Sequence, residues 1–131
     1  MITEDYVSFE TAELLKERGF NEKCRAFYVL HASGEARFCI STSYEEGWNY
    51  NKEENFVFSA PTLQMAMKWL RVMHDRYIEI SRDTSADLTG VVFRVDICDG
   101  ALQCLHHIDG FPTYEEACDG AMKYCLENLI K

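Results

Sequence analysis

The clearest pattern in the sequence is an alternation of side chains over residues 91–98. Apolar side chains recur at every second position, at Val91, Phe93, Val95 and Ile97. Because successive side chains of a β-strand point to opposite faces, a period of two predicts a strand with one buried face. The dipeptide Asp99-Gly100 follows and is typical of a two-residue hairpin turn. We therefore expect residues 101–108 to return as the antiparallel partner strand.

Three segments carry signals for the start of a helix. Ser8 is placed to cap a helix over residues 7–20, because a serine oxygen accepts hydrogen bonds from the free N–H groups of the first turn. Pro61 opens a second helix whose apolar residues recur at helical spacing. Thr113 and Glu116 have the spacing of a capping box ahead of a third helix. The sequence thus predicts three helices.

The remaining strand-like runs complete the predicted fold. Residues 24–32 and 36–42 are separated by a short Ser-Gly-Glu break, residues 56–58 form a brief apolar run, and residues 77–81 read as a further strand. The order is α-β-β-(β)-α-β-β-β-α, without the regular alternation of strand and helix that a parallel sheet needs. We therefore predict a single α+β domain over residues 1–131. Its mainly antiparallel sheet of four or five strands would pack against three helices.

The charge of the chain bears on the partners that it suits. Asp and Glu number 22 against 13 Lys and Arg, which gives a formal net charge of −9. The phosphates of nucleic acids and anionic membrane surfaces are recognised largely by Lys and Arg, so both are disfavoured as direct partners. No apolar run approaches the roughly 18 residues that a membrane helix needs. We expect instead a protein partner, with a basic one favoured by charge.

The six cysteines are expected to be reduced. They are Cys24, Cys39, Cys98, Cys104, Cys118 and Cys125. They fall in apolar runs, where free cysteine behaves as a small hydrophobic residue. The acidic first residues do not resemble a secretory signal, and a chain of this size does not need disulfides to fold. We therefore expect free thiols and a cytoplasmic location.

The tightest cluster of titratable residues comprises Cys98, Asp99, Cys104, His106, His107 and Asp109, of which Cys104, His106 and His107 bear on catalysis. A thiol activated by a histidine base is a nucleophile, so these three residues are weak candidates for catalysis. Regular strand alternation would place Cys104 and His106 on one face and His107 on the other. The alternative is that all three are ordinary sheet residues. A zinc site needs four converging ligands, and phosphate-binding glycine loops and a serine-nucleophile motif do not occur in the sequence, so we expect no metal and no cofactor.

A polar segment over residues 43–55 is long for a connection in a compact domain and carries three aromatic residues. They are Tyr44, Trp48 and Tyr50. Tyrosine and tryptophan are common at the energetic centres of protein interfaces, so the three are a candidate interaction surface. The alternative is that they fold back and anchor the loop to the domain. The sequence leaves both interpretations open.

Parts of the chain resemble a known group of proteins. The similarity covers residues 6–20, residues 59–71 with His74 and residues 77–80, and residues 114–117 with residues 121–126. These segments, in this order, resemble small proteins of phages and prophages of gut Bacteroidetes. The resemblance implies a product that a mobile element expresses inside a bacterial cell. It implies no site residues, since none of the segments carries a catalytic motif.

Together these observations predict a small, non-enzymatic accessory protein of phage or prophage origin that acts by binding another protein. A small thiol- or histidine-dependent enzyme and a structural subunit of a larger assembly are the alternatives. The three make different demands on the structure. A binding protein needs an exposed recognition surface, an enzyme needs its thiol and histidine together in a cleft, and a subunit needs a large apolar interface.

Overall fold

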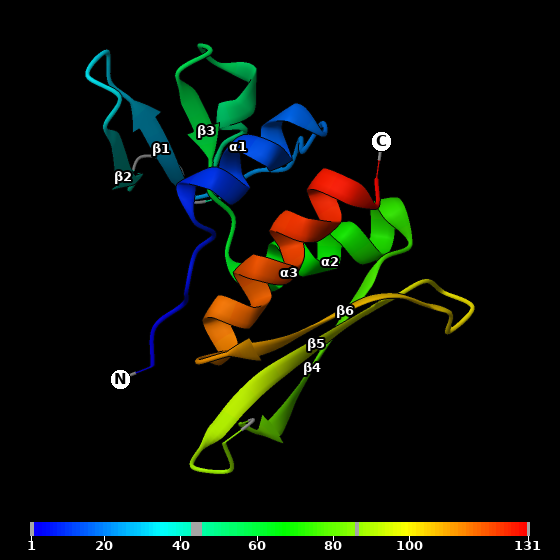
Figure 1. Cartoon of the computed structure of the whole chain (residues 1–131). Helices are drawn as coiled ribbons and strands as arrows, with labels where there is room; N and C mark the ends of the chain where they lie inside the picture. Colours follow the sequence, from blue (N-terminus) through cyan, green and yellow to red (C-terminus); the bar gives the residue numbers. More distant parts are fainter. Residues whose placement is uncertain (1, 43–45, 86, 131) are drawn as a thin grey trace. The chain divides into compact units, whose positions relative to one another are not determined.

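The computed structural model describes residues 2–42, 46–85 and 87–130. Within these residues the chain is an α+β protein with three α-helices and six strands, in the predicted order (Figure 1). The strands form two three-stranded antiparallel sheets, where the sequence predicted a single sheet of four or five strands. The central strand β1 pairs with β2 and β3, and the central strand β5 pairs with β4 and β6, so the two sheets share no strand.

The chain divides into two compact units, Met1–Gln64 and Met65–Lys131, and each is described by itself. The single domain expected over residues 1–131 stays a prediction. The first unit contains α1 (Phe9–Glu17), β1 (Ala26–Leu30), β2 (Ala36–Ile40), a short 3₁₀ helix η1 (Tyr50–Lys52) and β3 (Val57–Ser59). Its sheet has the order β2-β1-β3, so that β2 is an edge strand.

Helix α1 packs on one face of the first sheet through aromatic contacts. Ser8 is its N-cap, as predicted, with its Oγ accepting a hydrogen bond from the Thr11 N–H at 3.3 Å. The Phe9 ring meets Tyr28 of β1 and Phe58 of β3 edge-on, at centroid distances of 5.6 and 5.2 Å. Such edge-to-face pairs are favourable beyond the area that they bury. They fix α1 over the centre of the sheet.

The segment between β2 and β3 is drawn back onto the first sheet. Trp48 and Cys24 exchange two backbone hydrogen bonds of 2.9 Å each. Gly47 has a φ of +82°, and a side chain there would collide with the Cys24 backbone. The Asn51 side chain accepts a hydrogen bond from the Ser59 N–H at 2.8 Å. These contacts hold the described part of the loop against β1 and β3.

The second unit is built around a longer hairpin sheet. Its elements are most of α2 (Leu63–His74), then β4 (Tyr77–Thr84), β5 (Val91–Cys98), β6 (Cys104–Phe111) and α3 (Tyr114–Asn128), with the strand order β4-β5-β6. Helix α3 contacts all three strands. Figure 1 shows α2 and α3 on the same side of this sheet. The other face, the open face, is therefore left without a helix from this unit.

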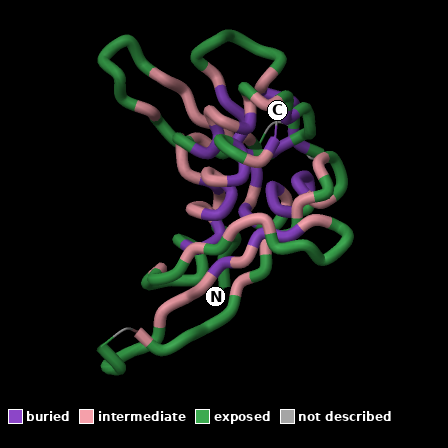
Figure 2. The backbone as a smooth tube through the Cα atoms, turned by 45° about the vertical axis from the view of Figure 1, so that its right-hand side comes forward, coloured by how far each residue is buried: buried purple, intermediate pink, exposed green. Residues whose placement is uncertain are grey.

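The helix-covered face of the second sheet is the apolar one. Val95 and Ile97 of β5 are fully buried. Buried residues recur at helical spacing along α3, at Ala117, Cys118, Ala121, Met122, Cys125 and Leu126 (Figure 2). At Gly120 the Phe111 ring occupies the space that a side chain would need. The apolar residues that alternate over residues 91–98 are therefore those whose side chains face α3.

The turn between β5 and β6 is longer than the two residues predicted. The strands end at Cys98 and resume at Cys104, and the Asp99 N–H donates to the Gln103 carbonyl at 3.0 Å. Leu102, with a φ of +66°, takes the left-handed position. The Gly100 N–H donates to the Asp75 carboxylate at 3.1 Å. This contact with the residue after α2 accounts for a wider turn than the sequence alone suggests.

Candidate functional site

The prediction that Cys104 and His106 share a face of the strand is wrong. In the register of the sheet Cys104 lies opposite Cys98, whereas His106 lies opposite Ile97. The two pairs are adjacent on β5 but are separated by an extra residue on β6, which is a β-bulge. Ile97 and Cys98 point to opposite faces because they are consecutive in a strand. Cys104 and His106 therefore also point to opposite faces.

The two histidines have different surroundings. The His106 ring lies flat on Tyr124 of α3, with ring centroids 3.8 Å apart and an interplanar angle of 4°. This places His106 in the packing between the sheet and α3. His107 is exposed and lies opposite Asp96 in the register. It therefore belongs to the open face, as Cys104 does.

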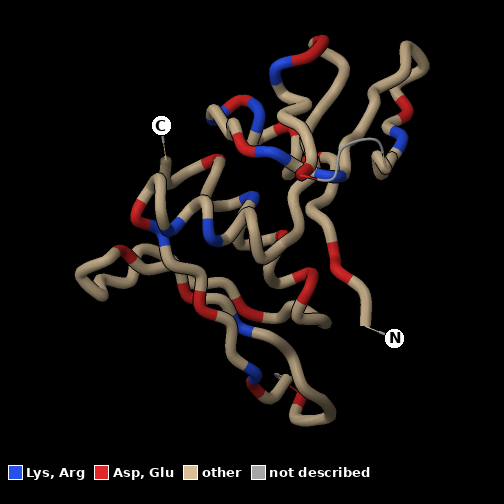
Figure 3. Tube along the Cα trace, turned by 180° about the vertical axis from the view of Figure 1, so that it is seen from behind, with Lys and Arg blue, Asp and Glu red and all other residues tan. Residues whose placement is uncertain are grey.

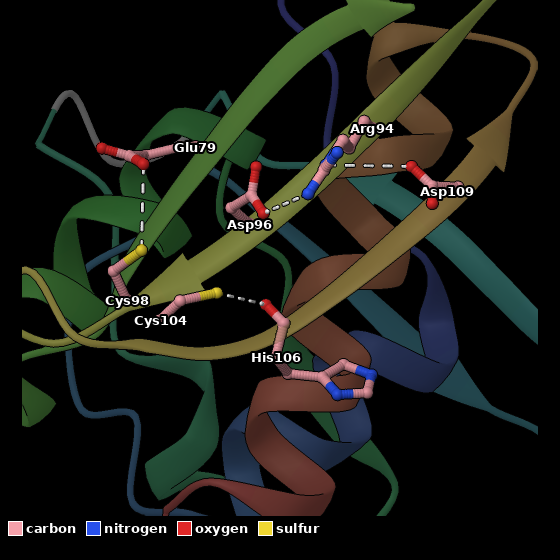
Figure 4. Close-up of polar contacts among 7 residues, drawn as sticks. All are labelled: Glu79, Arg94, Asp96, Cys98, Cys104, His106 and Asp109. Atoms are coloured by element: carbon pink, nitrogen blue, oxygen red, sulfur yellow. Dashed lines mark hydrogen bonds and ion pairs between the residues drawn. The ribbon is translucent and has the colours of Figure 1, made fainter.

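The open face carries a cluster of thiol and charged side chains, shown in part in Figure 4. Its members are Glu79, Arg94, Asp96, Cys98, Cys104, His107 and Asp109. Arg94 forms ion pairs with Asp96 at 3.4 Å and with Asp109 at 3.9 Å. Cys98 Sγ lies 3.8 Å from Glu79 Oε2, in the geometry of a donated hydrogen bond. Cys104 Sγ donates to the main-chain carbonyl of His106 at 3.7 Å, so this contact does not involve the imidazole.

The thiol of Cys98 is held in its protonated form. Burial raises its pKa, and the negative charge of Glu79 and the neighbouring Cys104 raise it further. Cys98 is 9% exposed, whereas Cys104 is exposed. The two opposed cysteines therefore differ in access to solvent. Within the described residues, no group of three or more His, Cys, Asp and Glu side chains is arranged to hold a metal ion.

Sequence reasoning missed the opposition of Cys98 and Cys104, and also missed Glu79. A signal for the first was present, because both cysteines directly flank the turn at residues 99–103. Reading that turn as two residues long obscured the pairing. Nothing in the sequence pointed to Glu79, since its place beside Cys98 depends on the register of β4 against β5.

The aromatic loop forms less of an exposed surface than the sequence suggested. Tyr50 is 8% exposed and stacks on Phe27, with centroids 4.3 Å apart, as in the alternative interpretation that the aromatic residues anchor the loop. The reason is that the loop is hydrogen-bonded back onto the sheet. Trp48 is 40% exposed, and its Nε1 donates to Glu53 Oε1 at 2.7 Å. Tyr44 lies outside the described residues.

A second exposed apolar site, which sequence reasoning missed, is the edge strand β2. Phe38 is 41% and Ile40 54% exposed. Two hydrogen bonds lie at the ends of the β1–β2 hairpin and identify its hydrogen-bonded positions. The His31 N–H donates to the Glu35 carbonyl, and the Ser41 N–H donates to the Arg25 carbonyl. In an antiparallel pair, hydrogen-bonded and non-hydrogen-bonded positions alternate. The even-numbered positions of β2, residues 36, 38 and 40, therefore direct their N–H and C=O groups away from β1.

We compared the chain with protein-family models, curated proteins and solved structures. No protein-family model, curated protein or solved structure matches the chain. Of the helices formed by the described residues, none has the length and apolar character to cross a membrane. Figure 3 shows acidic residues spread along both units, with basic residues interspersed among them.

Proposed function

We propose that this chain is a small, non-enzymatic accessory protein of phage or prophage origin, acting inside a bacterial cell by binding another protein. The observation that carries the binding proposal is the exposed apolar edge of β2. An exposed edge strand with apolar side chains is a template for pairing with another chain. Such strand addition takes affinity from main-chain hydrogen bonds and specificity from alternate side chains.

The chemistry of the edge defines the partner. Residues 36, 38 and 40 offer outward N–H and C=O groups, and Phe38 and Ile40 offer apolar surface beside them. The partner therefore supplies an extended segment whose alternate side chains are apolar. Because the net charge is −9, the association rate should be higher with a basic protein than with an acidic one. The partner that fits best is a basic protein with a free strand.

The other functions have less support. A thiol- or histidine-dependent enzyme centred on Cys104 with His106 needs the two side chains within hydrogen-bond reach, and they point to opposite faces of the sheet. His107 shares the face of Cys104, so this alternative is now restricted to that pair. A structural subunit of a larger assembly stays a prediction.

The test is affinity capture from a Bacteroidetes lysate with the purified chain and matched variants. Ile40→Pro removes one outward N–H group, and an edge strand tolerates proline where the N–H does not bond to a neighbour. Ile40→Thr keeps that N–H and replaces the ethyl group of the Ile40 side chain with a hydroxyl. Val72→Thr is the control, because Val72 is an exposed apolar residue of α2 that belongs to the second unit. Trp48→Ala tests the loop separately.

The proposal expects one saturable partner that Val72→Thr retains, Ile40→Thr weakens and Ile40→Pro loses. Circular dichroism of each variant confirms that it is folded. If the folded Ile40→Pro variant still binds the partner and the Trp48→Ala variant does not, the binding surface is the loop and not β2. The absence of any saturable partner for the wild-type chain would count against a binding function.

A further inference from the structure

We propose that Cys98 and Cys104 form a cross-strand dithiol that a small-molecule disulfide converts reversibly into an intramolecular disulfide. The inference is independent of the binding function proposed for the edge strand, because the two cysteines lie on the open face of the second unit. It assigns a modification site to this hairpin. The class of co-substrate is a low-molecular-weight disulfide such as glutathione disulfide.

The register of the hairpin provides the geometry for this bond. The Asp99 N–H donates to the Gln103 carbonyl, and the Gln103 N–H donates to the Asp99 carboxylate, so Asp99 and Gln103 occupy a hydrogen-bonded position. The next pair, Cys98 and Cys104, is therefore of the non-hydrogen-bonded kind. Cα atoms in such pairs lie about 4.5 Å apart in antiparallel sheets. Disulfides bridge Cα atoms that are roughly 4.4–6.8 Å apart. The sulfurs can therefore join by rotation of the side chains, without moving a strand.

The other cysteines of the chain lack this arrangement. Cys39 lies opposite Phe27 in the first sheet. Cys118 and Cys125 are seven residues apart on α3, and a helix rise of about 1.5 Å per residue separates them by roughly 10 Å. Among the strand pairings of the described residues, Cys98 with Cys104 is the one that opposes two cysteines. We therefore expect oxidation to be selective for this pair.

The difference in exposure between the two thiols sets the order of the steps. Cys104 is exposed, so its thiolate attacks one sulfur of the small disulfide, forming a mixed disulfide and releasing one thiolate. Cys98 then gives its proton to the Glu79 carboxylate, with which it is hydrogen-bonded. The Cys98 thiolate attacks Cys104 Sγ and displaces the second small thiolate. The two small thiolates take up the two protons, so that two protein thiols and one small disulfide give one protein disulfide and two small thiols.

The experiment treats the purified full chain with mixtures of glutathione and glutathione disulfide, blocks the remaining thiols, and digests the chain on the N-terminal side of aspartate. Cleavage before Asp96, Asp99 and Asp109 gives one fragment of residues 96–98, which contains Cys98, and one of residues 99–108, which contains Cys104. Cys118 lies in a third fragment. Mass spectrometry should find the first two fragments joined, with the mass of two hydrogen atoms lost. Reduction should separate them.

Two variants separate the steps. In Cys98→Ser the reaction should stop at a stable mixed disulfide of glutathione on Cys104, and Cys98→Ala should behave in the same way. In Cys104→Ser the fragment with Cys98 should stay unmodified at the same concentrations. In Glu79→Gln the mixed disulfide should persist several-fold longer at neutral pH, because the acceptor of the Cys98 proton is lost. Cys39→Ser is the matched control and should oxidise like the wild-type chain.

Two results would overturn the proposal. One is a wild-type chain that accumulates the mixed disulfide on Cys104 as stably as Cys98→Ser does. The other is a disulfide that joins a different pair of cysteines while Cys98 and Cys104 stay separate. Loss of the Cys98–Cys104 bond in folded Cys39→Ser would also contradict the selectivity argued above. None of these results bears on binding at β2, so this proposal and the proposed function fail independently.

Discussion

The two three-stranded sheets of this chain have outer strands of different character. The edge strand β2 of the first sheet has an uninterrupted register with β1 and exposes Phe38 and Ile40. In the second sheet, β6 has two register irregularities, and β4 carries exposed charged residues. Bulges and charges are the devices by which proteins prevent their edge strands from pairing with other chains. The outer strands of the second sheet have both devices, whereas β2 has no register irregularity and carries a single charged residue, Arg37.

The two sheets also differ in the chemical groups that they expose. At β2 the available groups are main-chain donors and acceptors with apolar side chains beside them, which suit a polypeptide partner. On the open face of the second sheet the available groups are thiols, carboxylates and Arg94, which suit proton and sulfur chemistry. Two similar sheets therefore support different roles because different side chains are left outside the core.

The same substitution should have unequal effects in the two sheets. Ile97→Ala removes a fully buried side chain between β5 and α3, and we expect it to lower the free energy of unfolding by roughly 2–5 kcal/mol. Ile40→Ala removes a half-exposed side chain and should cost less than about 1 kcal/mol. Urea denaturation followed by circular dichroism measures both. Equal losses would show that Ile40 is part of a core and not of a binding edge.

Oxidation of the hairpin should stabilise the second unit. A disulfide between Cys98 and Cys104 closes a loop of about seven residues, for which chain entropy gives about 2 kcal/mol. The free energy of unfolding of the oxidised chain should exceed that of the reduced chain by this order. Cys104→Ser, treated identically, should show no difference. A lower stability on oxidation would mean that the bond strains the strands, contrary to the geometry derived for this pair.

Alkaline pH should destabilise both units through one buried thiol in each. Burial raises the pKa of Cys24 to about 12 and that of Cys125 to about 11, from an ordinary value of 9.0. An acid whose pKa is higher in the folded state contributes stability below its unfolded pKa and loses it as the pH rises towards the folded pKa. From about pH 9 upward each thiol should lower the free energy of unfolding by at most about 1.4 kcal/mol per pH unit.

The control for the alkaline effect is substitution of each thiol. Cys24→Ala should remove the contribution of the first unit, and Cys125→Ala that of the second, so either variant should show a shallower dependence on pH. The measurement is a series of denaturation curves between pH 8 and about pH 11. A slope that is unchanged in both variants would place the titrating groups elsewhere.

The smallest predicted effects concern the helix caps. Ser8→Ala in the first unit and Thr113→Ala in the second each remove a side-chain oxygen that accepts from a free N–H of the first helical turn. Each should cost about 1 kcal/mol, and glycine at the same position only a few tenths. Thermal unfolding of the alanine and glycine variants compares them. Alanine variants as stable as the wild-type chain would show that these caps contribute nothing.

The elements of the fold follow from local chemistry, which is why the sequence predicts them well. The Ser8 and Thr113 caps and the alternation at residues 91–98 depend on neighbours within a few positions, and the structure confirms each of them. The division into two sheets could not be predicted in this way. It depends on which edge of β1 is met by β3, a pairing between residues about thirty positions apart.

The candidate sites were predicted less well for the same reason. The bulge at Leu105 reverses the faces of the side chains that follow it as far as the second irregularity, between Ile108 and Phe111, so simple alternation wrongly grouped Cys104 with His106. The sequence left open whether Tyr50 belongs to an interaction surface or anchors the loop, because the hydrogen bonds of Asn51 and Trp48 that hold the loop on the sheet depend on partners distant in sequence. The exposure of β2 depends on the absence of a neighbouring strand among the described residues, which no local pattern records.

The most direct test of the account is residue-resolved amide hydrogen exchange of the chain, free and bound to the captured partner. The N–H groups of residues 37 and 39 bond to β1 and should exchange slowly in both states. Those of residues 36, 38 and 40 point outward, so they should exchange fast in the free chain and slowly in the complex. Protection of these three by the partner is the result that strand addition at β2 predicts. Fast exchange at all three in a saturated complex would contradict it.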